Sequence, residues 1–338
     1  MTFMRKFDTL LRKSNNTMCK IDSQDGINLY IYDNNFRLLS SKELLDGDFS
    51  FLDYWFDIDI NNNVYGIIND KKGTLLSYNI TNKYLIKNSL LKYNPDEKFI
   101  KFVYINSNTE RTNIFYYIFN TDTPYSGSLI HHYKINNIWY THVIDSISYN
   151  VLTNFVVVYD NHDIPIVFYY KLSHGVEELF ISIFDADSNS WCTPIQITDS
   201  RKAKIYLSVI KDYRNCYHIL FSENNSNKYY CTYINGYINN YNFNISNSLV
   251  ISDTVACTFP NILESQGRLY AHWVEYHNLY VGFSDDYGNK WNKVMIYNDS
   301  LENPFVCCNY HSNCIEENTI NYFTLYMNQN SNHILGID

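Results

Sequence analysis

Basic residues are scarce in this sequence, and their scarcity excludes several classes of partner. The 338 residues include 26 Lys and Arg against 35 Asp and Glu, which gives a formal net charge of −9. Nucleic-acid-binding proteins carry a basic surface, so this charge argues against a nucleic acid as the ligand. It gives no more support for binding to an anionic membrane. We therefore expect neither nucleic acid nor membrane among the partners.

Long apolar runs are also missing. No stretch reaches the ~18 apolar residues of a membrane-spanning helix. Near the start, the charged residues Arg5, Lys6, Asp8 and Arg12 interrupt any apolar centre of a signal peptide. The sequence as given therefore predicts a cytoplasmic protein, or one domain of a longer chain.

The eight cysteines do not follow the spacing of a disulfide framework. A chain of this length does not need disulfides to hold its core, so reduced thiols are expected. The densest group of metal-ligand type is Cys308, His311 and Cys314, because Cys307 and Cys308 point to opposite faces of a strand and only one of them can join. A fourth ligand is not evident, and no glycine-rich phosphate loop occurs. We keep these three residues as a candidate zinc site but predict no metal and no cofactor.

Aromatic residues, in contrast, are abundant. Tyr (33), Phe (20) and Trp (5) make up 17% of the chain, while Gly (11) and Pro (6) are few. Runs of aromatic and β-branched residues are typical of strands. A polar turn with an aromatic anchor recurs every 46 to 55 residues, at Phe36, Tyr84, Trp139, Trp191, Tyr237 and Trp291. Because a period of ~40 to 50 residues is typical of propeller blades, the sequence predicts an all-β chain, a β-propeller of four-stranded antiparallel blades.

The number of blades depends on the two ends of the chain. The anchors lie 51 residues apart on average, and seven blades fit this period better than six if residues 3–11 form a strand. Phe3, Phe7, Leu10 and Leu11 also fit helical spacing, and a helix there would favour six blades. We predict seven blades, with six as the alternative, in a single domain over residues 1–338. The approximate blade ranges are 1–45, 46–94, 95–148, 149–200, 201–254, 255–300 and 301–338.

Residues 284–291 read Ser-Asp-Asp-Tyr-Gly-Asn-Lys-Trp. The side chains of Ser284 and Asp286 can bond nearby backbone, Gly288 supplies a positive φ, and Trp291 returns a ring to the core, so this octet predicts a rigid turn. The order S-x-D-x-G-x-x-W resembles the Asp box of the bacterial neuraminidase repeat in sialidase-like β-propellers. The resemblance implies a member of that superfamily, in which Asp boxes lie away from the active site, and the unmatched catalytic arginines described next make a non-catalytic member the prediction.

The catalytic residues of a sialidase are not matched. Sialidases resemble one another in three arginines that clamp the substrate carboxylate. The nearest match to the family's Arg-Ile-Pro motif is Arg37 with the two leucines after it, and it lacks the proline. Other glycosidases need a carboxylate pair, for which Asp57, Asp59 and Glu264 are the candidates, with Asp57 and Asp59 on one face of a strand. The role of a solvated turn residue is favoured for each of these acids.

The sequence therefore favours a non-enzymatic β-propeller that binds a glycan or a partner protein through its top face or central channel. Tyrosine pairs support this interpretation, because adjacent rings on a strand point inward and outward, and an outward Tyr can stack on a sugar or seat a protein. One alternative is a divergent, sialidase-like glycoside hydrolase with a central carboxylate site. Another is a passive structural or self-assembly module.

Overall fold

Strands account for nearly all of the regular structure, as the aromatic and β-branched runs predict. The computed structural model describes residues 3–81, 83–108, 110–317, 320–322, 324–328 and 334–336, with side chains from residue 8 onward. The chain divides into two compact units, which we call unit 1 (Met1–Arg5, Ser148–Cys307 and Thr319–Asp338) and unit 2 (Lys6–Ile147 and Cys308–Asn318). No helix in the described residues is long and apolar enough to cross a membrane.

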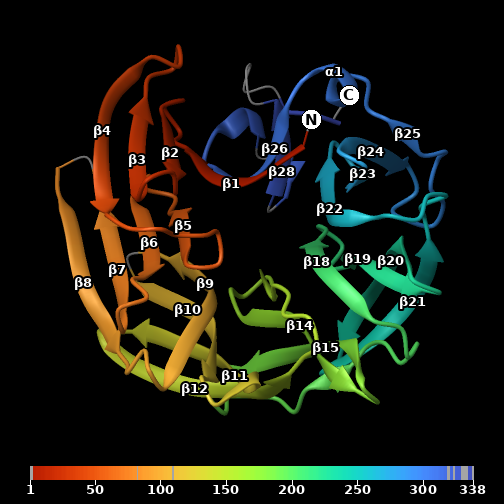
Figure 1. Cartoon of the computed structure of the whole chain (residues 1–338), viewed down its shortest axis with the longest axis horizontal. Helices are drawn as coiled ribbons and strands as arrows, with labels where there is room; N and C mark the ends of the chain where they lie inside the picture. The colour runs from red at the N-terminus through yellow and green to blue at the C-terminus, as the bar shows by residue number, and fades with distance from the viewer. Residues whose placement is uncertain are drawn as a thin grey trace. The chain divides into compact units, whose positions relative to one another are not determined.

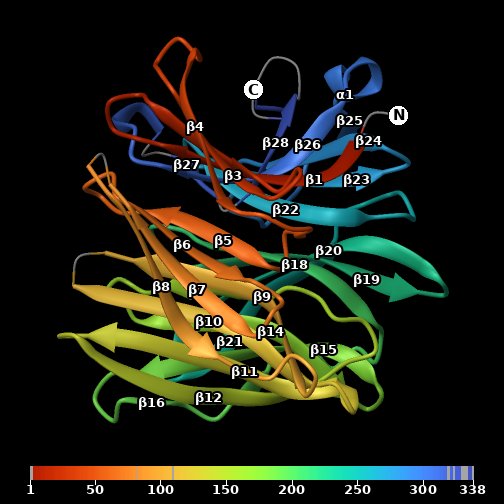
Figure 2. The ribbon, with the colours of Figure 1, turned by 60° about the vertical axis from the view of Figure 1, so that its left-hand side comes forward.

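The first three sheets are formed mainly by unit 2. In each, four strands follow one another as antiparallel neighbours, and Figure 2 shows β5–β8 beside β9–β12. Their strands are β1 (Phe3–Arg12), β2 (Met18–Asp22), β3 (Ile27–Tyr32), β4 (Leu38–Leu45); β5 (Tyr54–Ile58), β6 (Val64–Asn69), β7 (Thr74–Ile80), β8 (Leu85–Lys92); and β9 (Lys98–Ser107), β10 (Arg111–Asn120), β11 (Thr123–Ile135), β12 (Ile138–Ser148).

Unit 1 holds three further antiparallel sheets. Figure 1 shows β18–β21 next to the sheet that begins with β22, and their inner strands are in contact. The strands are β13 (Val156–Tyr159), β14 (Pro165–Ser173), β15 (Val176–Asp185), β16 (Ser190–Trp191), β17 (Ile195–Gln196); β18 (Lys204–Lys211), β19 (Tyr217–Asn225), β20 (Lys228–Asn239), β21 (Asn242–Val250); and β22 (Thr258–Ser265), β23 (Arg268–Glu275), β24 (Asn278–Ser284), β25 (Met295–Ile296). A short helix α1 (Asp299–Glu302) and a 3-10 turn at Ile315–Glu317 follow.

The residues that the structure describes form six sheets, so the prediction of seven blades is wrong. After residue 301, β26 (Phe305–Ser312) and β28 (Thr324–Asn328) belong to the sheet of β1, and β27 (Ile320–Asn321) pairs with β22. The first segment is a strand, as the seven-blade count required, but β1 lies between β2 and β26. Strands from both ends of the chain therefore complete one sheet, which leaves fewer unpaired strand edges than a separate seventh blade would.

Polar turns occur at most of the predicted aromatic anchors, but the turn expected just before the anchor Tyr237, at residues 234–237, does not. Residues 234–237 lie inside β20, where Gly236 follows a register shift in the pairing with β21. The turn comes later, at Asn240 and Tyr241, which have φ of 49° and 59°. The glycine thus marks an irregularity within a strand rather than a turn.

One aspartate turn recurs at the first hairpin of several sheets. The Oδ1 atom of Asp59 accepts hydrogen bonds from the backbone NH groups two and four residues later, at 2.9 and 2.8 Å. Asp160 makes the same pair of bonds at 2.8 and 2.9 Å, and Asp212 makes them at 2.9 and 2.8 Å. A short acceptor side chain at the end of a strand thus organises the turn into the next strand.

Buried ion pairs join neighbouring sheets in both units. In unit 1, Lys204 Nζ of β18 lies 2.7 Å from Glu178 Oε2 of β15, and both side chains are fully buried. In unit 2, the buried Asp53 carboxylate lies 3.2 Å from Lys101 Nζ of β9 and 3.0 Å from Lys71 Nζ. Because removing one partner of such a pair leaves an uncompensated buried charge, these contacts fix which residues of adjacent sheets meet.

His272 of β23 is a fully buried histidine in unit 1. Its Nε2 atom lies 2.8 Å from the carbonyl oxygen of Gly336 and donates to it. The ring also packs edge-on against Tyr326, with centroids 6.1 Å apart. Burial lowers the pKa of His272 to about 4, although the bond to Gly336 acts in the opposite direction. The folded protein therefore holds this side chain neutral at pH values where an unfolded chain would protonate it.

We expect His272 to make stability depend on pH between about 6.5 and 4. Below its unfolded pKa of roughly 6.5 the unfolded state binds a proton that the folded state does not, so the free energy of unfolding falls until the pH reaches the folded pKa. His272→Gln should remove this contribution. Its free energy of unfolding should then fall by up to roughly 3 kcal/mol less over this pH range than that of the parent chain. Urea unfolding at pH values from 7 to 4 measures the free energy of unfolding, and substitution of the exposed His162 by Gln is the control. An unchanged slope in His272→Gln would contradict the assignment.

Candidate functional site

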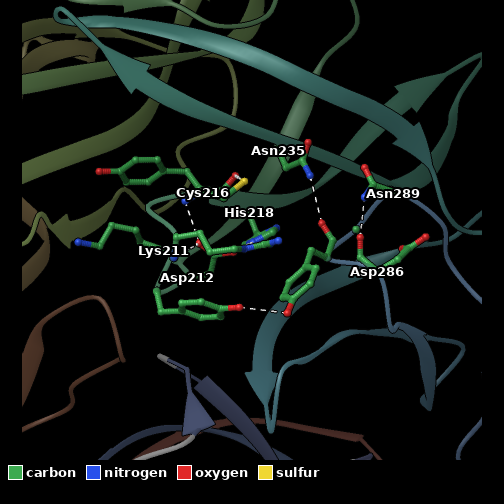
Figure 3. Close-up of polar contacts among 12 residues, drawn as sticks. Lys211, Asp212, Cys216, His218, Asn235, Asp286 and Asn289 are labelled. Atoms are coloured by element: carbon green, nitrogen blue, oxygen red, sulfur yellow. Dashed lines mark hydrogen bonds and ion pairs between the residues drawn. The ribbon is translucent and has the colours of Figure 1, made fainter.

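The hairpin between β18 and β19 differs from the other aspartate turns in the side chains it carries. Arg214, Cys216 and His218 stand two, four and six residues after Asp212. Asp212, Cys216 and His218 are all buried, while the Arg214 side chain is partly exposed. Figure 3 shows Asp212, Cys216 and His218 gathered at this hairpin, with Lys211 pointing away from them. The same local fold that only closes a turn elsewhere here collects four reactive side chains.

Asp212 is the centre of this group. Its Oδ1 atom accepts the two backbone hydrogen bonds of the turn. Its Oδ2 atom accepts hydrogen bonds from Arg214 Nε and Nη2 at 2.9 and 2.6 Å. His218 Nε2 lies 3.3 Å from the same oxygen. Burial by itself would raise the pKa of Asp212, but the bonds from His218, Arg214 and the Cys216 backbone outweigh it and lower the pKa to about 2. The carboxylate therefore stays ionised.

His218 connects Asp212 to the next strand. Its Nδ1 atom lies 2.6 Å from the hydroxyl of Tyr233 in β20. In the tautomer protonated at Nε2, the ring donates to Asp212 and accepts from Tyr233, so both nitrogens are satisfied. Burial raises the pKa of the Cys216 thiol. With these protonation states the group is a closed hydrogen-bond network.

The predicted octet forms a tight turn after β24. Gly288 NH donates to Ser284 Oγ at 2.8 Å, and Ser284 Oγ donates to Asp286 Oδ1 at 2.9 Å. Lys290 NH donates to the same Asp286 oxygen at 2.8 Å, and Gly288 has φ 84°. These bonds hold a left-handed turn of the kind that glycine adopts without strain.

The octet turn also docks onto the preceding sheet of unit 1. Asn235 Nδ2 donates to the carbonyl of Tyr287 at 3.3 Å (Figure 3). The Arg214 guanidinium lies 3.3 Å from the centroid of the Tyr287 ring, and the hydroxyls of Tyr287 and Tyr213 are 3.1 Å apart. A Cβ atom on Gly288 would lie 1.9 Å from the Tyr233 hydroxyl. The octet therefore fastens the β22–β25 sheet to the hairpin that carries Asp212.

The structure separates the two candidate acids of β5. Asp57 lies in the strand, 3.2 Å from His311 Nδ1, and also accepts from Asn106 Nδ2 at 2.8 Å. Asp59 lies beyond the end of the strand, in the turn, where Oδ1 binds backbone NH groups. Asp57 is therefore a strand residue paired with His311, whereas Asp59 belongs to the turn that follows the strand.

The other predicted residues are distributed over both units. Glu264 is the penultimate residue of β22 in unit 1, where burial and the nearby Asp212 carboxylate raise its pKa. In unit 2, His311 pairs with Asp57, and Cys314 Sγ lies 3.1 Å from Asn16 Oδ1. Across the described residues, the one set of three or more side chains with suitably close metal-ligand atoms is Asp212, Cys216 and His218.

Sequence reasoning missed the Asp212 group. A signal was present, because an aspartate at the end of a strand is followed by Cys at the fourth position and His at the sixth. Cys216 immediately precedes β19 and His218 lies within it, and residues two apart in an extended segment point to the same side, which the turn returns to the aspartate. Recognising this signal in the sequence requires knowing that Asp212 begins the repeated turn.

Comparisons with known proteins show similarity in fold alone. No family model matches the chain, and no curated protein matches it. Among solved structures, an ulvan lyase of polysaccharide lyase family PL25 has a TM-score of 0.66 at 9% identity, covering 98% of this chain and 93% of that one. An oligogalacturonate lyase in complex with manganese has a TM-score of 0.53 at 9% identity, covering 87% and 78%. The WD40 domain of SCAP from fission yeast has a TM-score of 0.50 at 9% identity, covering 97% and 74%.

These similarities agree with the six antiparallel sheets of the chain. WD40 repeats form propeller blades of four strands. The fold class is therefore an all-β β-propeller with six blades, most of them four-stranded.

We expect Gly288→Ala to destabilise the protein more than Gly267→Ala in the same sheet. Both glycines have a positive φ, of 84° and 78°, but a Cβ on Gly267 has no heavy atom within 4 Å. Gly267→Ala should cost about 1 kcal/mol through backbone strain. Gly288→Ala should cost roughly 1 to 3 kcal/mol more, because Tyr233 must move away from His218. Equal losses in urea unfolding would show that the octet does not depend on contact with Tyr233.

Proposed function

We propose that this chain is a non-enzymatic, glycan-binding β-propeller and that its ligand stacks on Tyr213 beside Arg214. The observation that carries this function is an exposed aromatic ring on a rigid support. Tyr213 is 73% exposed, yet its hydroxyl is bonded to Tyr287 and its turn is held by Asp212. An exposed ring that is already ordered loses little conformational entropy when a ligand binds.

The groups around Tyr213 suit a polar ligand with an apolar face. Its ring meets that of Tyr287 edge-to-face, with centroids 6.4 Å apart. Arg214 is positioned by Asp212 and presents a partly exposed guanidinium, whose NH groups can donate to hydroxyl or carboxylate oxygens. A stacking ring next to fixed donors is suited to a sugar, which offers CH groups on one face and hydroxyls at its edge.

Two further considerations support a glycan rather than another ligand. The similar ulvan lyase was also solved bound to -[GlcA(1-4)Rha3S]-, with a TM-score of 0.62 at 8% identity, so a related architecture accommodates a polysaccharide. The resemblance of the octet to an Asp box would place the chain in the sialidase-like superfamily, and we retain that membership as part of the proposed function. Its octet acts here as support for Tyr287, not as the binding group.

A glycan array followed by calorimetry on the best ligand tests this function. Tyr213→Ala should weaken binding about tenfold or more, since lost stacking is on the order of 1 to 2 kcal/mol. The matched control is Tyr276→Ala, because Tyr276 is 72% exposed on a different hairpin, between β23 and β24. Equal effects of both substitutions would contradict the assignment of the site. If no glycan binds, a pull-down would favour a protein partner, and self-association in sedimentation would favour a structural module.

A divergent glycoside hydrolase is the second candidate, because in unit 2 Asp57 pairs with His311 and Trp55 meets the His311 ring at 5.8 Å. If this pair were catalytic, fluorogenic glycosides should be cleaved and Asp57→Asn should lower kcat at least 100-fold. Asp59→Asn is the matched control, since an amide oxygen keeps the turn. Absence of turnover, or equal loss in both variants, would eliminate the hydrolase.

A further inference from the structure

The repeated aspartate turn allows its copies to be compared position by position. Four and six residues after Asp59 stand Asn63 and Tyr65, and at the same positions after Asp160 stand two isoleucines. After Asp212 these positions hold Cys216 and His218. Beside the shared carboxylate, the β18–β19 hairpin thus places a thiol and an imidazole where the first-hairpin turns of Asp59 and Asp160 place an amide and a phenol, or two alkyl groups.

The three ligand atoms are close enough to share one ion. One oxygen of Asp212, the sulfur of Cys216 and one nitrogen of His218 lie within 4.8 Å of one another. The Asp212 Oδ2 to His218 Nε2 separation is 3.3 Å. Around a tetrahedral zinc ion, ligand atoms are separated by roughly 3.3 to 3.8 Å, given Zn–N, Zn–O and Zn–S bonds of about 2.0 to 2.3 Å. Bringing the three atoms to these separations would therefore complete three bonds.

The surroundings already supply the contacts that orient metal ligands. His218 Nδ1 lies 2.6 Å from the Tyr233 hydroxyl, and a ring protonated at Nδ1 would donate there and leave Nε2 free to bind metal. Asp212 Oδ1 is held by the backbone NH groups of Arg214 and Cys216, which leaves Oδ2 for the ion. Arg214 donates a hydrogen bond to Oδ2 in this structure. A bound cation would therefore replace part of the charge neutralisation that Arg214 provides to Asp212.

We propose that Asp212, Cys216 and His218 form a three-ligand site for a borderline-soft divalent metal ion, zinc in particular. A thiolate and an imidazole exclude calcium and magnesium, which prefer oxygen ligands. Cys216 binds as the thiolate and its proton leaves to solvent. Three protein ligands leave the fourth tetrahedral position for water or another small donor. This site is independent of the proposed glycan function, because the ion binds beneath the hairpin, without a sugar.

Zinc and cobalt titrations of the full chain test the site without any glycan. Calorimetry with Zn²⁺ should give one equivalent. Co²⁺ should produce a thiolate-to-metal charge-transfer band and the visible bands of four-coordinate cobalt. Cys216→Ser should abolish the charge-transfer band and weaken Zn²⁺ binding at least 100-fold. The control is Cys192→Ser, which removes a half-buried thiol on another sheet and should leave both signals unchanged.

Each outcome decides the assignment. Loss of binding in Cys216→Ser with retention in Cys192→Ser supports the site, and weaker zinc binding by His218→Gln gives a second line of support. Unchanged zinc binding in Cys216→Ser, equal loss in both cysteine variants, or no stoichiometric binding by the parent chain would overturn it. If Cys216→Ser does not fold, the cobalt spectrum of the parent chain decides, because a bound ion without a charge-transfer band excludes Cys216 as a ligand. Glycan-array results do not affect any of these readouts.

Discussion

Contact between a glycine and a tyrosine hydroxyl holds unit 1 together at the octet turn. Gly288 has no side chain, so the Tyr233 hydroxyl can lie where a Cβ would be and reach His218. His218 meets Asp212, Asp212 binds Arg214, and Arg214 covers the ring of Tyr287, the residue before Gly288. These contacts form a closed circuit between two sheets. Because each residue positions the next, a substitution at one of them disturbs the contacts of the others.

This circuit explains how a common turn becomes a site. Asp59 and Asp160 use the same backbone bonds as Asp212, and the second carboxylate oxygen of Asp59 accepts from Asn63 and Tyr65. At Asp212 the second carboxylate oxygen meets a cation and an imidazole, and burial strengthens these contacts. The exposed edge of the circuit carries Tyr213, and its interior carries the thiol and imidazole. One hairpin thus carries an exposed tyrosine at its surface and, beneath it, a buried group of side chains of metal-ligand type.

Much of the fold was predictable, because strand patterns and turn residues are local. The aromatic period indicated blades, and the octet indicated a left-handed turn at Gly288, which has φ 84°. Two predictions failed because the same local sequence pattern is compatible with more than one structure. Gly236 looked like a turn residue but lies inside β20, next to a register shift. Strands near both ends of the chain looked like parts of different blades, yet β1 and β26 share one sheet.

By itself, the sequence determined the all-β class, the repeat and the glycine turn of the octet, since these follow from side-chain spacing and backbone preference. Tertiary structure decided the blade count and the site. Strand pairing between distant segments set the number of sheets. The meeting of Tyr287 with Arg214, 73 residues apart in the sequence, depends on the packing of one sheet against the next. No local pattern encodes such a contact, because it arises only when two separately formed surfaces match in shape and charge.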